Sequence, residues 1–185
     1  MDDIVKAALK KWPNVPDCFG WLALDARGDW YMRDDQTQAA APFPQLKGSR
    51  IEHLKLREFI ERNYLCDAHG QWFFQNGPQR VYVELEAAPW VWRLMPVAGS
   101  APGVTSHTGL AARPSEVLLD ESGRLFLATD LGLGLVHTLD MGWAADAIEA
   151  GLWVTQEVRF DSLASRFNHC LKPKSPVGVK PAQMP

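Results

Sequence analysis

The chain has 185 residues, 46% of them hydrophobic and 22% charged, and this composition excludes a disordered protein. Its 19 basic and 22 acidic side chains give a net charge of -3, so no overall positive charge attracts nucleic acid or an anionic membrane. No stretch reaches the ~20 consecutive apolar residues that cross a bilayer, and the acidic start Met1–Lys6 is unlike a signal peptide. We therefore expect a cytoplasmic protein of one or two small domains that binds neither nucleic acid nor membrane.

The cysteines point to the same compartment. Cys18, Cys66 and Cys170 are odd in number and widely spaced. Disulfide frameworks need paired cysteines and form in oxidising compartments. We therefore expect reduced thiols.

The first part of the chain predicts a helix, a hairpin and a loop. Apolar residues recur at helical spacing from Val5 to Trp12, and Pro13 follows them, which predicts one short helix. Strand-like segments flank Asp25–Gly28, whose glycine can supply the positive φ of a tight hairpin turn. The Pro- and Ala-rich segment 36–46 predicts a loop.

A capped helix, a second hairpin and an alternating strand follow. Ser49 and Glu52 have capping-box spacing, which predicts a helix from there through Arg62. Asp67–Gly70 has the composition of another hairpin turn. Apolar and acidic residues alternate along Val81–Glu86, which predicts a strand with one buried face.

The segment from Pro96 to Pro114 is rich in small residues and proline and shows no hydrophobic period, which predicts a flexible linker or loop. A third hairpin turn is expected beyond it, at Asp120–Gly123. The remaining predicted elements are a strand over Gly134–Leu139, a helix over Trp143–Ala150, a strand over Trp153–Val158, a helix beginning at Asp161 and a tail over Lys172–Pro185.

These elements predict an α+β fold of mainly antiparallel β-hairpins and meanders, with three or four short helices in two lobes. We expect an N-terminal lobe over 1–95, a linker over 96–114, a C-terminal lobe over 115–171 and a tail over 172–185. The three turns share one sequence pattern, in which Asp is followed by any two residues, then Gly, any one residue and two bulky residues. Independent use of one turn chemistry and a true internal repeat both explain this pattern.

The first half of the chain also resembles an uncharacterised bacterial family. The segments that carry the resemblance are Gly28–Tyr31, Gly48–Ile51 with its helix to Phe59, Asp67–Phe74 and Val81–Pro89. They are similar to the family known as domain of unknown function twelve eighty-five. The resemblance implies a β-rich fold with two lobes and a link to signalling or regulation, and it implies no activity, ligand or catalytic residue.

Glu84 and Glu86 are candidate site residues. Alternate strand positions place them on one face about 7 Å apart, where two carboxyl groups can share acid–base work. The sequence offers them no partner base and no activating neighbour, which favours a solvated face. An enzyme that uses these carboxylates is therefore the alternative function.

The aromatic content is unusual, with 8 tryptophans in 185 residues. Trp72 with Phe74, and Trp90 with Trp92, occupy alternate positions and so share a strand face. Indole combines apolar area with a hydrogen-bond donor and is enriched at binding hot spots, although small lobes also fill their cores with large rings. The expected ligand-binding residues are Trp72, Glu84, Glu86, Trp90 and Trp92.

Metal and cofactor motifs are absent from the sequence. Zinc sites need about four converging ligands, usually as two close pairs, and Cys66–His69 with His169–Cys170 does not supply them. The glycines around Gly132 complete neither a dinucleotide fingerprint nor a phosphate loop. We expect no metal, no cofactor and a non-enzymatic regulatory protein that binds a small ligand or a protein segment, with a homodimer left open.

Overall fold

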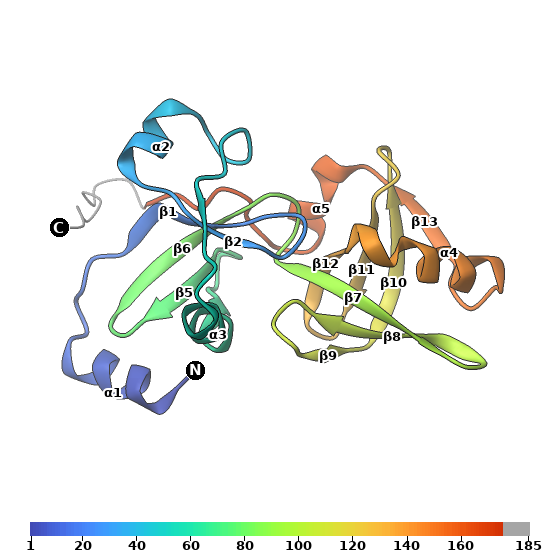
Figure 1. Ribbon diagram of the computed structural model, residues 1–185, viewed down its shortest axis with the longest axis horizontal. Helices are drawn as coiled ribbons and strands as arrows, with labels where there is room; N and C mark the ends of the chain where they lie inside the picture. The colour runs from blue at the N-terminus through green and yellow to red at the C-terminus, as the bar shows by residue number, and fades with distance from the viewer. Residues whose placement is uncertain (176–185) are drawn as a thin grey trace. The chain divides into compact units, whose positions relative to one another are not determined.

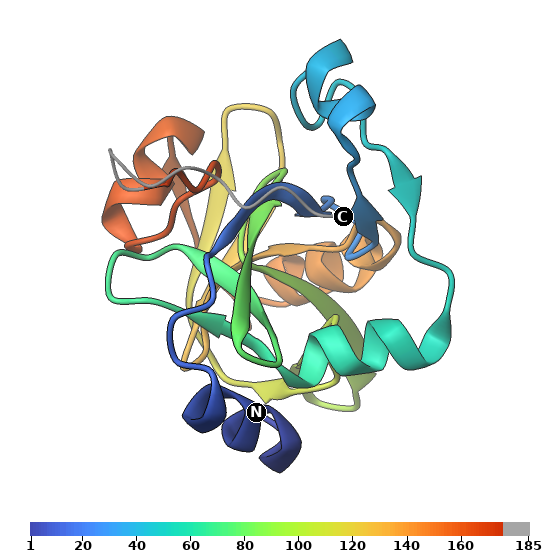
Figure 2. The same ribbon diagram turned by 90° about the vertical axis from the view of Figure 1, so that its left-hand side faces the viewer.

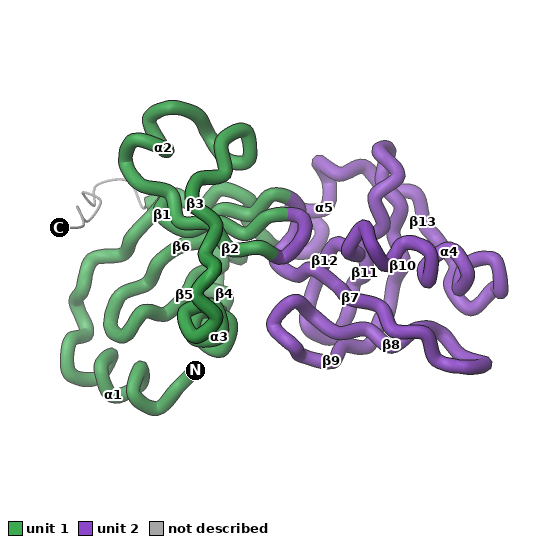
Figure 3. The backbone as a smooth tube through the Cα atoms, viewed as in Figure 1, with its two compact units in different colours: residues 1–25, 29–86, 169–185 green, residues 26–28, 87–168 purple. Residues whose placement is uncertain are grey.

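The computed structural model describes residues 1–175, which form two compact units (Figure 3). Unit 1 contains residues 1–25 and 29–86 together with the chain from residue 169, and unit 2 contains residues 26–28 and 87–168. The chain thus enters unit 2 after residue 86, and the boundary predicted at 96–114 is wrong. Of the predicted tail, residues 176–185 lie outside the described part of the chain.

Unit 1 is built on a six-stranded sheet with the strand order β3-β2-β1-β6-β5-β4. Its strands are β1 (Cys18–Leu24), β2 (Trp30–Met32), β3 (Ser49–Arg50), β4 (Tyr64–Cys66), β5 (Trp72–Asn76) and β6 (Gln79–Leu85). Its helices are α1 (Asp3–Lys11), α2 (Asp35–Ala40) and α3 (Leu54–Arg62). All strand pairs are antiparallel except β1 with β6, which are parallel.

Strand β6 confirms the alternation read from the sequence. Val81, Val83 and Leu85 are buried, and they share one face of the sheet because successive side chains point to opposite sides. Tyr82 and Glu84 consequently lie on the other face. That face carries the polar chemistry of unit 1.

One predicted loop of unit 1 contains a helix. The segment 36–46 was expected to be irregular because of its prolines, yet its first part belongs to α2. The Asp34 carboxylate accepts a hydrogen bond from the Thr37 N–H at 2.8 Å and so caps the first turn of the helix. The local cap therefore outweighs the composition of the segment.

The predicted capping box is also wrong. Ser49 lies in β3, and α3 has its N-cap at His53, four residues after the position that the box implies. The His53 ring instead caps α3, because its Nδ1 accepts a hydrogen bond from the Leu56 N–H at 3.3 Å. Figure 2 shows the long extended connection between α2 and α3 that contains β3.

Unit 2 is built on a seven-stranded sheet with the strand order β13-β10-β11-β12-β7-β8-β9. Its strands are β7 (Trp90–Val97), β8 (Ser100–Ser106), β9 (Ala111–Ala112), β10 (Pro114–Asp120), β11 (Leu125–Thr129), β12 (Gly132–Val136) and β13 (Thr155–Val158). The 3-10 helix η1 (Thr138–Asp140) leads into α4 (Met141–Glu149), and α5 (Phe160–Arg166) follows β13. Helix α4 packs beside β7 and β8 (Figure 1). The predicted α+β class is confirmed.

The segment 96–114 is a hairpin rather than a linker. Strands β7 and β8 pair antiparallel, with Leu94 opposite Val104 and Trp92 opposite Ser106. Val104 and Ser106 are buried, so β8 alternates like any other strand. Its small residues and its proline conceal this alternation in the sequence.

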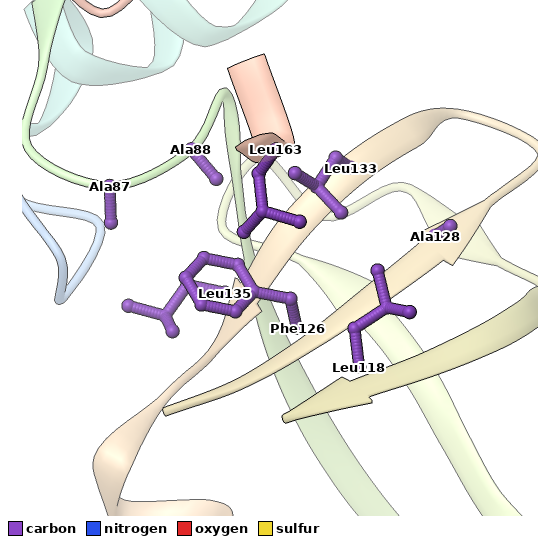
Figure 4. Close-up of a cluster of buried hydrophobic side chains, with 8 residues drawn as sticks. All are labelled: Ala87, Ala88, Leu118, Phe126, Ala128, Leu133, Leu135 and Leu163. Atoms are coloured by element: carbon purple, nitrogen blue, oxygen red, sulfur yellow. The ribbon is translucent and has the colours of Figure 1, made fainter. Parts of the chain in front are cut away.

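The core of unit 2 holds its sheet and α5 together. Figure 4 shows the buried cluster, which contains Ala87, Ala88, Leu118, Phe126, Ala128, Leu133, Leu135 and Leu163. Leu118, Phe126 and Leu163 are completely buried. Burial of each such side chain stabilises the unit by about 1.5–3 kcal/mol. Helix α5 joins this core through Leu163 and through the partly buried Phe160.

The three predicted Asp–Gly turns are confirmed. Gly28, Gly70 and Gly123 have φ values of +82°, +74° and +75°, which L side chains rarely adopt. In each turn the Asp side chain accepts the N–H of the residue four positions later, at 2.8–2.9 Å. The common geometry follows from local hydrogen bonding, so it requires no repeat ancestry.

A fourth turn of the same kind lies in unit 2 and was not predicted. Ser106 takes the place of Asp, and its hydroxyl oxygen accepts the Leu110 N–H at 3.0 Å. Gly109 has φ +84°, as the glycines of the other turns do. The serine hides this turn from a search for Asp and Gly.

Candidate functional site

Glu84 and Glu86, the carboxylates chosen from the sequence, are both paired with cations. Arg33 Nη1 donates to Glu84 Oε2 at 2.7 Å. Lys47 Nζ lies 2.9 Å from Glu86 Oε2 and also 2.9 Å from Asp25 Oδ2. The face expected to be solvated is therefore an ionic network.

Arg33 is a deeply buried charge in this network, with its side chain only 2% exposed. Its Nη2 donates to the Ala41 carbonyl oxygen at 2.7 Å, and its guanidinium lies 5.8 Å from the centre of the Phe43 ring. A buried cation without a counter-charge is strongly destabilising. Glu84 therefore stabilises unit 1 by balancing Arg33.

Lys47 is held between two carboxylates. Burial opposes its charge, but hydrogen bonds to Asp25 and Glu86 outweigh burial and raise the pKa of Lys47. The ammonium group thus stays protonated at neutral pH. It neutralises both carboxylates, which leaves Glu86 without the character of a general base.

The geometry around the two glutamates favours a structural role. Neither of them lines any of the pockets described below. Within residues 1–175 no three His, Cys, Asp or Glu side chains are grouped as a metal site requires. Cys18, Cys66 and Cys170 are free thiols.

Trp90 and Trp92 do not form an exposed aromatic surface, and that expectation is corrected. Their rings stack with centres 6.0 Å apart, but Trp92 is completely buried and Trp90 is 6% exposed. The indole N–H of Trp92 donates to the Leu127 carbonyl at 3.0 Å, and that of Trp90 donates to the Leu131 carbonyl at 2.8 Å. The pair fills the core of unit 2, as the alternative explanation had it.

Trp72 lies in unit 1 and is half-buried. Its ring packs on Tyr64, with ring centres 4.7 Å apart and planes tilted by 39°. Glu84 and Glu86 belong to the same unit, whereas Trp90 and Trp92 belong to unit 2. The five residues expected to form one ligand surface are therefore divided between the two units.

The largest hollow described here lies in unit 2 between β8 and β10, and we call it the β8–β10 groove. It has a volume of about 490 Å³. Its lining consists of Ala101, Pro102, Pro114–Val117, Leu152–Val154 and Gln156. The lining thus comes from β8, from β10, from the segment that precedes β13 and from β13 itself.

Both strands present unpaired edges to this groove within the described chain. β9 covers β8 only at Val104 and Thr105, so Ala101 and Pro102 lie beyond its end. β13 joins β10 from Val117 onward, so Pro114–Glu116 has no strand on that side. Unpaired strand edges present backbone N–H and C=O groups that can bind another chain.

Exposed apolar side chains surround the same groove. Val154 is 79% exposed and Leu152 is 46% exposed. A neighbouring hollow of about 240 Å³ shares Leu152 with the groove and adds Val97 and Trp143. Exposed apolar side chains gathered in one place mark interaction sites more often than chance.

One unpaired carboxylate lies beside the groove. Asp146 lines the neighbouring hollow, and within residues 1–175 it has no ion-pair partner. Glu116 in the groove is paired with Arg166. Glu157 of β13 lines a different hollow together with Arg159.

Sequence reasoning missed this groove because the segment 96–114 was interpreted as a linker. Pro102 and Pro114 were the available signal. Proline removes a backbone donor and is therefore confined to strand edges, strand starts and bulges.

Comparison with known proteins places the chain in a family. A family model with the description "Protein of unknown function (DUF2946)" matches residues 1–175. The chain therefore belongs to this family, DUF2944. No curated protein matches the sequence.

Two solved structures are similar to the chain. A DUF1285 family protein from Silicibacter pomeroyi DSS-3 is 13% identical, with a TM-score of 0.48, over 79% of this chain and 84% of that one. A DUF1285 family protein from Shewanella baltica OS155 is 16% identical, with a TM-score of 0.46, over 71% and 92%. The resemblance to this family expected from the sequence is confirmed, and none of these descriptions names an activity.

Proposed function

We propose that the protein is a cytoplasmic, non-enzymatic regulatory protein whose unit 2 binds an extended, basic segment of a partner protein in the β8–β10 groove. The unpaired strand edges beside the groove carry this proposal. An extended segment placed there exchanges backbone hydrogen bonds with an edge, a mode known as β-augmentation. The free thiols support the cytoplasmic location, because unpaired cysteines are typical of reducing compartments.

The lining of the groove defines the side chains of the partner. Alternate residues of an extended segment point the same way, so apolar residues at alternate positions pack on Leu152 and Val154. Pro102 and Pro114 have no N–H, so at these positions the edges only accept hydrogen bonds. The partner segment therefore supplies the donors there and contains no proline opposite them.

Charge defines the rest of the partner. Asp146 has no cation of its own within the described chain, so lysine or arginine beside the apolar positions gains an ion pair with it. The same carboxylate repels an acidic segment. Opposite charge of this kind sets specificity and association rate more than affinity.

A displayed library of random peptides tests the proposal. Panning against the full chain should enrich peptides with apolar residues at alternate positions and neighbouring Lys or Arg. A synthetic copy of the enriched sequence, measured by fluorescence polarisation, should lose at least about tenfold in affinity for Val154→Asp. Val154 is 79% exposed, so the substitution leaves the fold intact.

Leu139→Asp is the matched control. Leu139 is 70% exposed, belongs to the same unit and does not line the groove, so this variant should bind as the wild type does. Equal binding to both variants, or enrichment of acidic peptides, would contradict the proposal. A concentration-dependent dimer that Val154→Asp dissociates in sedimentation would replace the partner segment with a second copy of the chain.

A further inference from the structure

A separate pocket in unit 1 has the chemistry of a small-ligand site, and we call it the Asp17–Arg80 pocket. Its volume is about 460 Å³, within the ~300–1,000 Å³ usual for small-molecule sites. It is lined by Asp17, Cys66, Asp67, Ala68, His69, Gln71, Phe73, Arg80 and Tyr82. The lining combines one guanidinium, two carboxyl groups and two aromatic rings.

Strand register brings these groups together. Cys18 of β1 lies opposite Val81 of the parallel strand β6. The residues on either side of this pair therefore face the opposite surface of the sheet, with Asp17 beside Arg80. On the other side of β6, Phe73 of β5 is paired directly with Tyr82. The pocket thus lies over β5 and β6, with the turn between β4 and β5 completing its lining.

The aromatic wall of the pocket is held rigidly. The Tyr82 ring stacks on Phe19, with centres 4.4 Å apart and planes within 6°. Phe73 approaches the same ring at 5.6 Å. The Tyr82 hydroxyl donates to Asp67 Oδ2 at 3.2 Å. These contacts orient the Tyr82 ring before any ligand arrives, which lowers the cost of binding.

Asp67 is a positioning residue in this arrangement. Its Oδ1 accepts the N–H groups of His69 and Gln71 at 2.8 and 2.9 Å, while Oδ2 accepts from Tyr82. Both oxygens are thus occupied by the turn and the aromatic wall. Asp17 is the carboxyl group left to face a ligand.

Asp17 and Arg80 line one pocket without forming an ion pair with each other or with any other residue of the described chain. The Arg80 guanidinium lies 4.7 Å from the centre of the Phe73 ring. Burial raises the pKa of the Asp17 carboxyl, and the Arg80 charge opposes this without cancelling it. The pocket therefore presents a cation and a carboxyl group that are near but not joined.

We propose that this pocket binds a free α-amino acid with an apolar or aromatic side chain. The ligand ammonium binds Asp17, its carboxylate binds Arg80, and its side chain packs on the rings of Phe73 and Tyr82. Both charged ends are thereby satisfied by charge-assisted hydrogen bonds. This site is independent of the partner groove proposed for unit 2.

The charge balance of the lining argues against other ligand classes. A polyphosphate would meet Asp17 and Asp67 with Arg80 as its main cation, and a simple cation would meet Arg80. A neutral sugar would leave both the guanidinium and the Asp17 carboxyl without charged partners. The zwitterion matches both groups at once.

Calorimetry and thermal shift on the full chain test the proposal with L-phenylalanine, N-acetyl-L-phenylalanine and L-phenylalanine amide. L-phenylalanine should bind and raise the melting temperature. N-acetylation removes the ammonium charge and amidation removes the carboxylate, so each analogue should bind at least about tenfold more weakly.

Two variants assign each end of the ligand. Asp17→Asn should weaken L-phenylalanine at least about tenfold and remove the difference between it and its N-acetyl analogue. Arg80→Gln should also weaken L-phenylalanine at least about tenfold, and it should remove the difference between L-phenylalanine and its amide. Asp3→Asn is the matched control, because Asp3 is 97% exposed and does not line the pocket. This control should bind as the wild type does.

Several outcomes would overturn the proposal: no binding of any of the twenty amino acids at millimolar concentration, variants that keep the wild-type discrimination, or binding of inorganic phosphate in place of the amino acid. Val154→Asp in unit 2 should leave amino-acid binding unchanged. Failure here is therefore distinguishable from failure of the partner groove.

Discussion

Two pairs of residues at alternate strand positions were expected to be exposed, and both are covered, one by ion pairs and the other by the apolar core. Glu84 and Glu86 in unit 1 were expected to face solvent, and Trp90 and Trp92 in unit 2 were expected to offer a surface. The glutamates are instead joined to Arg33 and Lys47, and the tryptophans are in the core.

The difference teaches what alternation determines. It places two side chains on one face of a sheet, because the period of a strand is two residues. It does not determine what covers that face. Arg33 is 51 residues from Glu84 in the sequence, and the backbone that receives the Trp92 N–H is 35 residues away.

The largest expected loss of stability comes from a substitution that disrupts the packing of Trp90 and Trp92. A Cβ at Gly134 would lie 2.4 Å from Trp92 Nε1 and 2.7 Å from Trp90 Cβ. Gly134→Ala should therefore lower the free energy of unfolding by about 3 kcal/mol, near the upper end for overpacked cores. Urea denaturation measures this change.

Gly142→Ala is the control for Gly134→Ala. Gly142 lies in α4, and an added Cβ there meets nothing within 4 Å. This variant should be neutral or more stable by about 0.5 kcal/mol. A Gly134→Ala protein as stable as Gly142→Ala would mean that the indoles are free to move.

The next largest effect distinguishes the contribution of Glu84 to stability from that of Glu86. Glu84→Gln leaves the buried Arg33 without its counter-charge, and we expect a loss of about 2 kcal/mol in unfolding free energy. Glu86→Gln leaves Lys47 paired with Asp25, so its loss should be below about 1 kcal/mol. Equal losses in urea denaturation would show that the network is not organised around Arg33.

The same contrast explains which parts of the fold could be predicted. The Asp–Gly turns were predicted correctly because their hydrogen bonds join residues at most four positions apart. The hairpin of β7 and β8 was missed because Ser100–Ser106 has few large side chains and its partner strand supplies the pairing. The start of α3 was misplaced because His53, a less common cap, replaced the expected serine.

Neither proposed site could be predicted from local patterns. The Asp17–Arg80 pocket depends on the parallel register of β1 and β6, which lie 63 positions apart where Cys18 faces Val81. The β8–β10 groove depends on where β9 and β13 stop pairing. Long-range register of this kind is decided by packing and not by the strand sequences alone.

An effect of similar size, which appears only at low pH, concerns a buried group that, unlike Arg33, has no counter-charge. Burial lowers the pKa of His169 to about 4 from 6.5, so the folded protein binds fewer protons than the unfolded chain between these values. The stability that the protein has while His169 is neutral in both states is therefore complete above pH 6.5, and it is lost as the pH falls toward 4. The loss at pH 4 should be about 2–3 kcal/mol.

His169→Gln isolates this contribution. Urea denaturation of both proteins at pH 7 and at pH 4.5 should give a smaller loss for the variant. His107, whose pKa burial lowers to about 3, is present in both proteins and cancels in the comparison. The same loss in both proteins would mean that His169 is protonated without cost in the folded state.

The smallest effect tests the feature that local sequence does determine. Gly123 and Gly109 have φ values of +75° and +84°, and a Cβ at either meets nothing within 4 Å. Only backbone strain remains, so Gly123→Ala and Gly109→Ala should each cost about 1 kcal/mol in unfolding free energy. Equal costs would show that the Ser106 turn is as strongly determined as the Asp120 turn. A Gly109→Ala protein as stable as the wild type would show instead that serine holds its turn loosely enough for the backbone to change conformation.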